Sequence, residues 1–142
     1  MLFRSELLYL AGTTNLNDSH WISFVVNSQL HSILIGDLMF HGGPDGLRAG
    51  SHAEVIGCLQ WFLQMLNSRA GLDTTPYTVD LLHVNWQPDG HLCGIFAQNS
   101  LDRYFNPHGY LQLVPTSMCH PHVETFIKIA HCHLLSPSVS VA

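Results

Sequence analysis

The sequence predicts an α+β fold with a small central sheet and helices packed on it. Two apolar segments, 22–26 and 31–35, are separated by the turn formers Asn27 and Ser28, so we expect them to pair as a strand hairpin. The segment 51–69 then carries apolar residues at three- and four-residue spacing, which is typical of an amphipathic helix. A strand hairpin followed by helices favours the α+β class.

The other elements follow in chain order. They are a short strand at 6–11, a polar turn at 12–19, a loop at 42–46, a third strand at 78–84, a helix that begins at Cys93, a last helix from Pro121 and a flexible tail at 136–142. In helix 51–69, Ser51 and Glu54 fit an N-terminal capping box, and Gly71 suits the position after the last turn. Cys58 lies on the apolar stripe of that helix, so we expect it to be the least reactive cysteine.

The composition favours one domain over residues 1–142, because 46% of the residues are hydrophobic. The net charge is −5, and Lys and Arg together number only 5, so no nucleic-acid partner is expected. Without a basic run or an apolar stretch of about 18 residues, no membrane partner is expected either. The four cysteines share no CxxC spacing and no export signal is recognised, which favours free thiols in an intracellular compartment, nucleus or cytoplasm.

Cys93 is a candidate nucleophile, because a polar turn ends at this residue and a helical apolar pattern begins immediately after it. Backbone N–H groups and the helix dipole stabilise a thiolate at such a position. Gln87 offers a side-chain amide that can return over the same turn as an oxyanion donor. A nucleophile and an oxyanion donor are the first two requirements of acyl transfer. The alternative is a buried structural cysteine beside a turn glutamine.

His20 and Asp37 stand at matching ends of the predicted hairpin. His20 precedes strand 22–26, and Asp37 follows strand 31–35, so the two residues face each other in an antiparallel pair. An Asp–His hydrogen bond there would fix the orientation and tautomer of the imidazole, as in a hydrolase triad. The alternative is a turn histidine and a strand-end aspartate without any relation.

Three sequence blocks together resemble the ubiquitin-like protease family, the SUMO- or sentrin-specific cysteine proteases. The blocks are His20-Trp21 before an apolar strand, Gly36-Asp37 after the next strand, and Gln87-Pro88-Asp89-Gly90-His91-Leu92-Cys93-Gly94-Ile95-Phe96. They stand in the family's order with matching intervals, and the resemblance extends from about Leu7 to Pro107.

The resemblance implies a papain-like cysteine proteinase fold with the nucleophile at a helix N-terminus. It implies hydrolysis of a peptide or isopeptide bond after the C-terminal diglycine of a ubiquitin-like modifier, during maturation or deconjugation. Carried over by position, Cys93 is the nucleophile and His20 the general base and acid. Asp37 orients His20, and Gln87 donates to the oxyanion. Trp21 flanks the channel for the glycine tail of the substrate, and neither a metal nor another cofactor is expected.

The sequence also departs from the family pattern. Leu38 stands where the family usually has Ser, and Leu92 stands where it often has Asp or Ser, but neither change removes a catalytic group. The N-terminal part of the family's domain, which supplies much of its modifier-binding surface, has no counterpart here. We therefore expect 1–142 to be a single, partial ubiquitin-like protease catalytic domain.

Two other functions remain open. The chain could be an inactive protease-like module that binds a ubiquitin-like protein without cleaving it. It could also be a metal-binding domain, since Cys119-His120-Pro121-His122 and His131-Cys132-His133 are ligand-type clusters. Their spacing matches no common zinc pattern, and adjacent side chains on a helix point apart, so the metal-binding function is the less favoured one.

Overall fold

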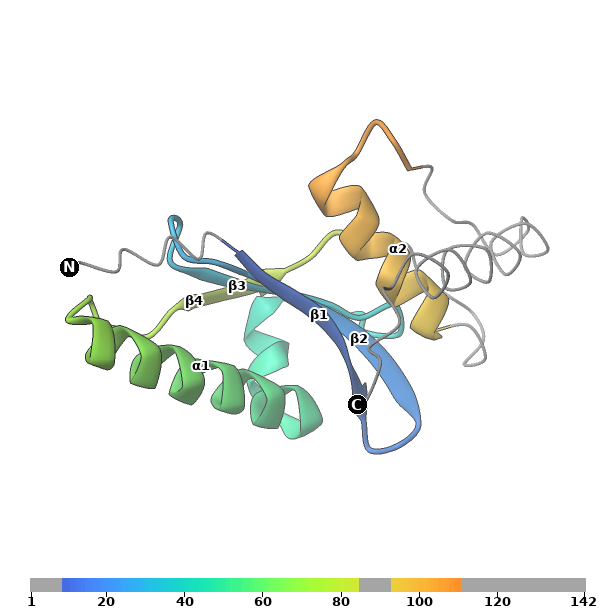
Figure 1. Cartoon of the computed structure of the whole chain (residues 1–142). Coiled ribbons are helices and arrows are strands. Elements are labelled where there is room, and N and C mark those ends of the chain that lie inside the picture. The colour runs from blue at the N-terminus through green and yellow to red at the C-terminus, as the bar shows by residue number, and fades with distance from the viewer. Residues whose placement is uncertain (1–8, 85–92, 111–142) are drawn as a thin grey trace, which may run out of the picture.

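The computed structural model of the chain describes residues 9–84 and 93–110 (Figure 1). They form a mixed sheet with helices on both faces. The strands are β1 (Tyr9–Leu16), β2 (His20–Asn27), β3 (Ser32–Gly36) and β4 (Thr78–Leu81), and they lie in the order β1-β2-β3-β4. The helices are the 3₁₀ helix η1 (Pro44–Arg48), α1 (Gly50–Ala70) and α2 (Cys93–Phe105).

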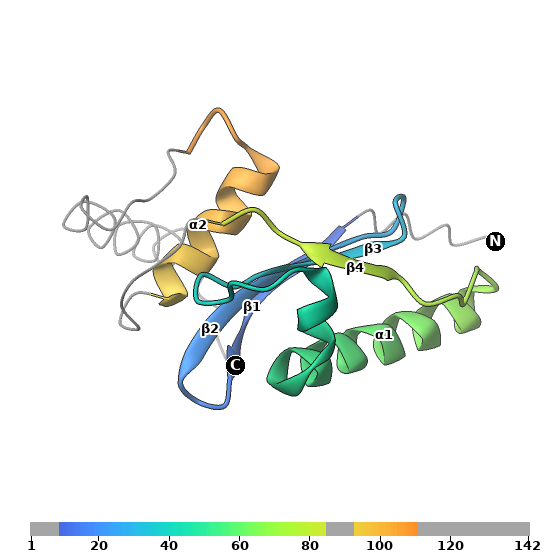
Figure 2. The same ribbon diagram turned by 180° about the vertical axis from the view of Figure 1, so that it is seen from behind.

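The predicted hairpin is confirmed, because β2 pairs with β3 in antiparallel fashion. β1 is antiparallel to β2, whereas β4 is parallel to β3. A parallel neighbour requires a crossover connection, and η1 and α1 provide it between β3 and β4. The hairpin therefore stays in the centre of the sheet, with α1 covering one face and α2 the other (Figures 1 and 2).

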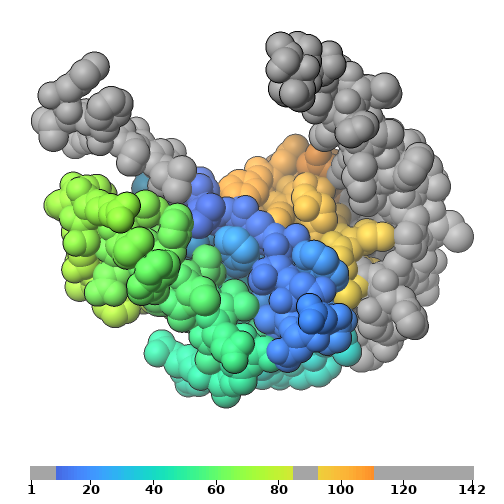
Figure 3. Space-filling model, turned by 60° about the horizontal axis from the view of Figure 1, so that its bottom comes forward, coloured from blue at the N-terminus to red at the C-terminus, as the bar shows by residue number. Residues whose placement is uncertain are grey.

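Alternation of side chains along β2 and β3 builds a separate apolar core on each face. The cluster on the α1 side consists of Leu16, Ile22, Val26, Ile33, Ile35, Leu47, Ile56, Leu63 and Tyr77. The cluster on the α2 side consists of Val25, Leu82 and Leu101. The β1–β2 surface lies between α1 and α2 in the space-filling view (Figure 3). Because the two helices begin near the same end of the hairpin, their first residues can contribute to one site.

A buried pair of hydroxyl groups joins α2 to the hairpin. Ser23 Oγ on β2 and Ser100 Oγ on α2 lie 2.7 Å apart, and Ser23 Oγ also donates to the Gly36 carbonyl oxygen at 3.3 Å. A Cβ atom at Gly36 would lie only 2.4 Å from Ser23 Oγ, so a larger residue would force the pair apart. The pair therefore fixes the position of α2 relative to the strand ends that carry His20 and Asp37.

Strand boundaries differ from the sequence prediction on the N-terminal side. β1 spans Tyr9–Leu16, so most of the segment 12–19 is strand and not turn. Pairing with β2 extends along all eight residues of β1, and this pairing outweighs the polar composition. The turn is confined to the residues after Leu16, where Asn17 and Asp18 adopt positive φ angles of 53° and 57°.

The capping box predicted for the central helix is wrong. α1 begins at Gly50 after Ala49, and no side-chain cap is formed. Ser51 Oγ instead accepts a hydrogen bond of 2.6 Å from Asn17 Nδ2, so its hydroxyl links α1 to the β1–β2 turn. The C-terminal prediction is confirmed, because Gly71 follows α1 in the left-handed conformation with a φ angle of 67°.

The predicted apolar stripe of α1 is confirmed only in part: Val55, Leu59 and Leu63 lie in or against the core on the α1 side. Ile56 and Leu63 are buried, whereas Cys58 is exposed and Phe62 keeps 39% of its surface accessible. The helix is apolar on more than one side, so periodicity alone does not select the buried face. The predicted buried position of Cys58 is therefore wrong, and its predicted low reactivity loses its basis.

Smaller differences between the predicted and the observed elements occur elsewhere in the chain. The predicted loop 42–46 overlaps η1, and β4 ends at Leu81 although strand was predicted to residue 84. The helix predicted from Cys93 is confirmed as α2. The predicted helix from Pro121 and the predicted tail 136–142 lie outside the described residues.

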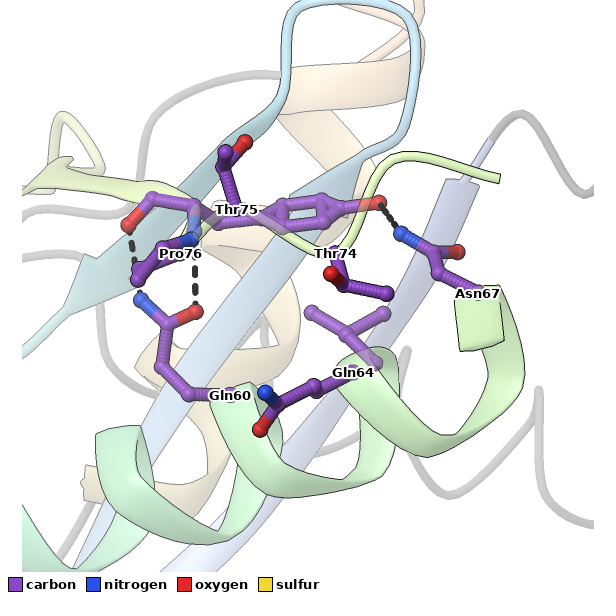
Figure 4. Close-up of a pocket in the computed structure, with 8 residues that line it drawn as sticks. Gln60, Gln64, Asn67, Thr74, Thr75 and Pro76 are labelled. Atoms are coloured by element: carbon purple, nitrogen blue, oxygen red, sulfur yellow. Dashed lines mark hydrogen bonds between the residues drawn. The ribbon is translucent and has the colours of Figure 1, made fainter. Parts of the chain in front are cut away.

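A glutamine holds the beginning of β4 against α1 (Figure 4). Gln60 Nε2 donates to the Tyr77 carbonyl oxygen at 2.7 Å, and the Tyr77 backbone N–H donates to Gln60 Oε1 at 2.9 Å. A small pocket lies beside this contact, lined in part by Gln64 and Asn67. The pocket is at the Ser32 end of β3, opposite to the end that leads to Asp37.

No helix in the described ranges is long and apolar enough to span a membrane.

Candidate active site

The hydrogen bond predicted between His20 and Asp37 is present in the structure. His20 is the first residue of β2, and Asp37 directly follows β3. The pairing of Ser23 with Gly36 brings these two strand ends together, and His20 Nε2 lies 2.6 Å from Asp37 Oδ1. The side chain of Asp37 is 4% exposed and that of His20 is 14% exposed, so water has little access to the bond.

Three donors converge on the Asp37 carboxylate. Oδ1 accepts from His20 Nε2 and, at 2.8 Å, from the Met39 backbone N–H, while Oδ2 lies 2.7 Å from His52 Nε2. Burial by itself raises the pKa of the Asp37 carboxyl group. The Met39 N–H bond, the two histidine bonds and the charge interaction with His20 outweigh burial, so the pKa lies below its ordinary value of 3.8. Asp37 is therefore ionised at neutral pH and acts only as an acceptor.

His52 is the site residue that the sequence interpretation missed. It lies in the first turn of α1, and its ring packs edge-on against Phe40 with the centroids 5.2 Å apart. The available signal was strand alternation: Asp37 continues the series Ile33 and Ile35, whose side chains face α1. A histidine at the beginning of the helix that covers this face can therefore reach Asp37.

The tautomer of His20 follows from its partner. Because an ionised carboxylate only accepts, the proton of neutral His20 is on Nε2. Nδ1 is then the unprotonated nitrogen, which can accept a proton. It is buried and has no hydrogen-bond partner among the described residues. This arrangement leaves the basic nitrogen of the imidazole available to a neighbouring acid.

Cys93 is the first residue of α2 and is 5% exposed. Its Sγ atom accepts a hydrogen bond of 3.4 Å from the backbone N–H of Trp21, the residue that directly follows His20. A backbone N–H and the beginning of a helix both stabilise negative charge on sulfur. The chain thus joins the side chains of His20 and Asp37 from two strand ends and places the Cys93 thiol against the backbone of the residue after His20.

Trp21 is 42% exposed and lies beside the beginning of α2. Its Cγ and Cδ1 atoms are 3.6 Å from the position that a Cβ atom on Gly94 would take. The indole ring therefore borders the first turn of α2, next to Cys93. Gln87, the predicted oxyanion donor, lies outside the described residues.

Comparison with solved structures finds a similar fold in the SUMO protease Ulp1. One chain, Ulp1 with its catalytic cysteine oxidised to a sulfenic acid, matches with a TM-score of 0.54 at 23% identity, over 68% of this chain and 43% of that chain. Another, the C-terminal Ulp1 protease domain in complex with Smt3, the yeast ortholog of SUMO, matches with a TM-score of 0.52 at 24% identity, over 67% and 40%. The chain has a Ulp1-like fold.

The Ulp1-like region is partial, because the chain spans less than half the length of these two Ulp1 chains. No protein-family model matches the sequence, and comparison with curated proteins gives no match. The likeness to Ulp1 therefore concerns the fold, and the chemistry of the site is argued from this chain's own residues.

In residues 9–84 and 93–110 of the Ulp1-like chain, no group of three or more His, Cys, Asp or Glu side chains could hold a metal ion. The ligand-type clusters at 119–122 and 131–133 lie outside these ranges. Their metal-binding role stays a prediction from sequence.

Proposed function

We propose that this chain is part of a cysteine protease that hydrolyses the bond after the C-terminal diglycine of a ubiquitin-like modifier. The observation that carries this proposal is the hydrogen bond from the backbone N–H of Trp21 to Cys93 Sγ, which places the thiol beside the residue that directly follows His20, whose imidazole is hydrogen-bonded to Asp37. A thiol, a base with a free nitrogen and a buried orienting carboxylate are the parts that thiol-based acyl transfer requires.

In the proposed reaction, His20 Nδ1 takes the proton from Cys93 Sγ, and the thiolate attacks the carbonyl carbon of the terminal glycine. The Gln87 amide donates a hydrogen bond to the oxyanion of the tetrahedral intermediate. The intermediate expels the amine, which receives its proton from His20, and a thioester on Cys93 remains. Water, deprotonated by His20, hydrolyses the thioester and returns the thiol.

The proposed modifier tail would pass Trp21 on its way to Cys93. Trp21 lies close to Gly94 beside this cysteine, and the resemblance to the ubiquitin-like protease family assigns it to the channel for the glycine tail. The protease domain of Ulp1 was solved in complex with Smt3, which supports a ubiquitin-like protein as the partner. The proposed substrate is such a modifier or its peptide or isopeptide conjugates, and the proposed compartment is the nucleus or cytoplasm.

Covalent capture tests this function. Ubiquitin and SUMO proteins that carry a C-terminal electrophile are expected to form an adduct with the wild-type chain but not with Cys93→Ser. Intact-protein mass spectrometry measures the adduct, and peptide mapping locates it at Cys93. An adduct of equal yield on Cys93→Ser, or labelling at another cysteine, would contradict the proposed nucleophile.

A binding module is the second candidate, because the chain covers only 43% and 40% of the two Ulp1 chains. Much of a modifier-binding surface can lie in the part of those chains that has no counterpart here. Tight non-covalent binding of a modifier by both wild type and Cys93→Ser, without any adduct, would favour the module over the protease.

A further inference from the structure

We propose that His52 is a positioning residue of this site, which holds the Asp37 carboxylate in the orientation that serves His20. This inference rests on the catalytic roles proposed above for His20 and Cys93. His52 itself touches no reacting atom in the proposed reaction, so its effect passes through Asp37.

The two carboxylate oxygens of Asp37 have separate partners. Oδ1 accepts hydrogen bonds from His20 Nε2 at 2.6 Å and from the Met39 backbone N–H at 2.8 Å, whereas Oδ2 lies 2.7 Å from His52 Nε2. Bonds to one oxygen alone allow the carboxylate to rotate about its terminal bond, because that torsion has a broad minimum. The bond from His52 to the second oxygen fixes the plane of the carboxylate, and with it the direction in which His20 is held.

His52 is itself held by rigid surroundings. It stands in the first turn of α1, a helix anchored in the core by Ile56 and Leu63. Its ring packs against Phe40, whose backbone N–H bonds to the Asp37 carbonyl oxygen at 3.3 Å. The turn after β3 and the beginning of α1 thus clamp the imidazole between them.

The protonation pattern is also defined. Asp37 is ionised and can only accept, so His52, like His20, must present an Nε2–H to it. Without His52, Oδ2 of a carboxylate that is 4% exposed loses a donor close to its charge. A hydrogen bond to a charged group contributes enough for its loss to change an equilibrium by about tenfold or more. His20 would then populate orientations and tautomers that do not serve Cys93.

Two substitutions separate the hydrogen bond from the packing. His52→Leu keeps an apolar contact for Phe40 but removes the donor, whereas His52→Gln keeps an N–H donor of similar reach. We expect His52→Leu to lower kcat for a modifier substrate, and the rate of Cys93 alkylation, by about tenfold with little change in KM. His52→Gln is expected to restore most of both rates.

His31→Leu is the matched control. His31 also makes a hydrogen bond, 2.8 Å from Nε2 to the Thr75 carbonyl oxygen, and stacks on Tyr77, but it lies at the opposite end of β3. It is expected to lower the melting temperature without changing the alkylation rate of Cys93. Equal losses of alkylation in His52→Leu and His31→Leu would show general destabilisation and overturn the positioning role.

Nitrogen-15 NMR of the histidine rings in the full chain provides a readout that requires no substrate. Wild type is expected to show His20 and His52 as Nε2–H tautomers, with His20 shifting to a mixture in His52→Leu. A wild-type spectrum with His52 as the Nδ1–H tautomer would overturn the proposal even if His52→Leu does not fold. Absence of a modifier adduct would contradict the protease function and leave this spectrum unchanged, so the two failures are distinguishable.

Discussion

Replacement of His20 by alanine is expected to lower the rate of modifier hydrolysis by about 1,000-fold or more, because removal of a triad member has effects of this size in other hydrolases. His20 contributes the one buried imidazole nitrogen that lacks a partner among the described residues, and it directly precedes Trp21, whose backbone N–H bonds to Cys93 Sγ. Without it, the site loses the base that is proposed to take the thiol proton.

Two measurements on His20→Ala distinguish catalysis from folding. Hydrolysis of a modifier fused to a fluorogenic group measures activity, and iodoacetamide reports the reactivity of Cys93 without any oxyanion. Both rates are expected to fall, while the control His31→Ala keeps both near wild type. A loss of hydrolysis below about tenfold in a folded His20→Ala chain would remove His20 from the mechanism.

Replacement of Asp37 by alanine is expected to have the second large effect, a loss of hydrolysis of about 1,000- to 10,000-fold by analogy with other triads. The substitution leaves His20, His52 and the Met39 N–H without their shared acceptor. His20 is then free to carry its proton on Nδ1, which is the tautomer that cannot accept the thiol proton.

Asp37→Asn is the matched comparison, because it keeps one oxygen and removes the charge. If the amide oxygen occupies the Oδ1 position, it still accepts from His20 and Met39, and the amide NH₂ faces His52. His52 must then change tautomer, whereas His20 keeps its own. Asp37→Asn is therefore expected to lose less activity than Asp37→Ala. Equal losses would mean that the charge, and not the orientation of His20, dominates.

Asp37→Ala and Asp37→Asn are also expected to change how the stability of the fold depends on pH in the acid range. The pKa of Asp37 is lower in the folded chain than its ordinary value of 3.8. The ionised group therefore stabilises the fold at pH values above 3.8, and this contribution disappears as the pH falls through the lower, folded pKa. Thermal melts between neutral pH and pH 3 measure it. Asp37→Asn should flatten this decline, and an unchanged decline would place its origin in other carboxylates.

The sequence predicts the hairpin, the start of α2 at Cys93 and the His20–Asp37 bond, because each depends on local pattern. The β-branched residues of 22–26 and 31–35 specify strands wherever they pack, and antiparallel pairing then brings the two strand ends together. The catalytic roles of Cys93, His20, Asp37 and Gln87, and the role of Trp21 beside the substrate, stay predictions.

The sequence does not predict His52 or the exposed position of Cys58, because both depend on how α1 is rotated against the sheet. That helix carries apolar residues on several sides, and the buried positions Ile56 and Leu63 are selected by tertiary packing. The capping box at Ser51 fails for a similar reason, since its hydroxyl bonds to Asn17 in a distant turn. Contacts between elements decide these features.

Competition between Cys93 and Cys58 for limiting iodoacetamide at neutral pH tests the central claim most directly. Cys58 is exposed and Cys93 is 5% exposed, so access alone favours Cys58. If His20, the Trp21 N–H and the start of α2 activate the thiol, Cys93 is labelled first in the wild type, and His20→Ala abolishes this preference. Peptide mass spectrometry measures the labelling at all four cysteines. Labelling of Cys58 before Cys93 in the wild type, with the same order in His20→Ala, would contradict an activated nucleophile at Cys93.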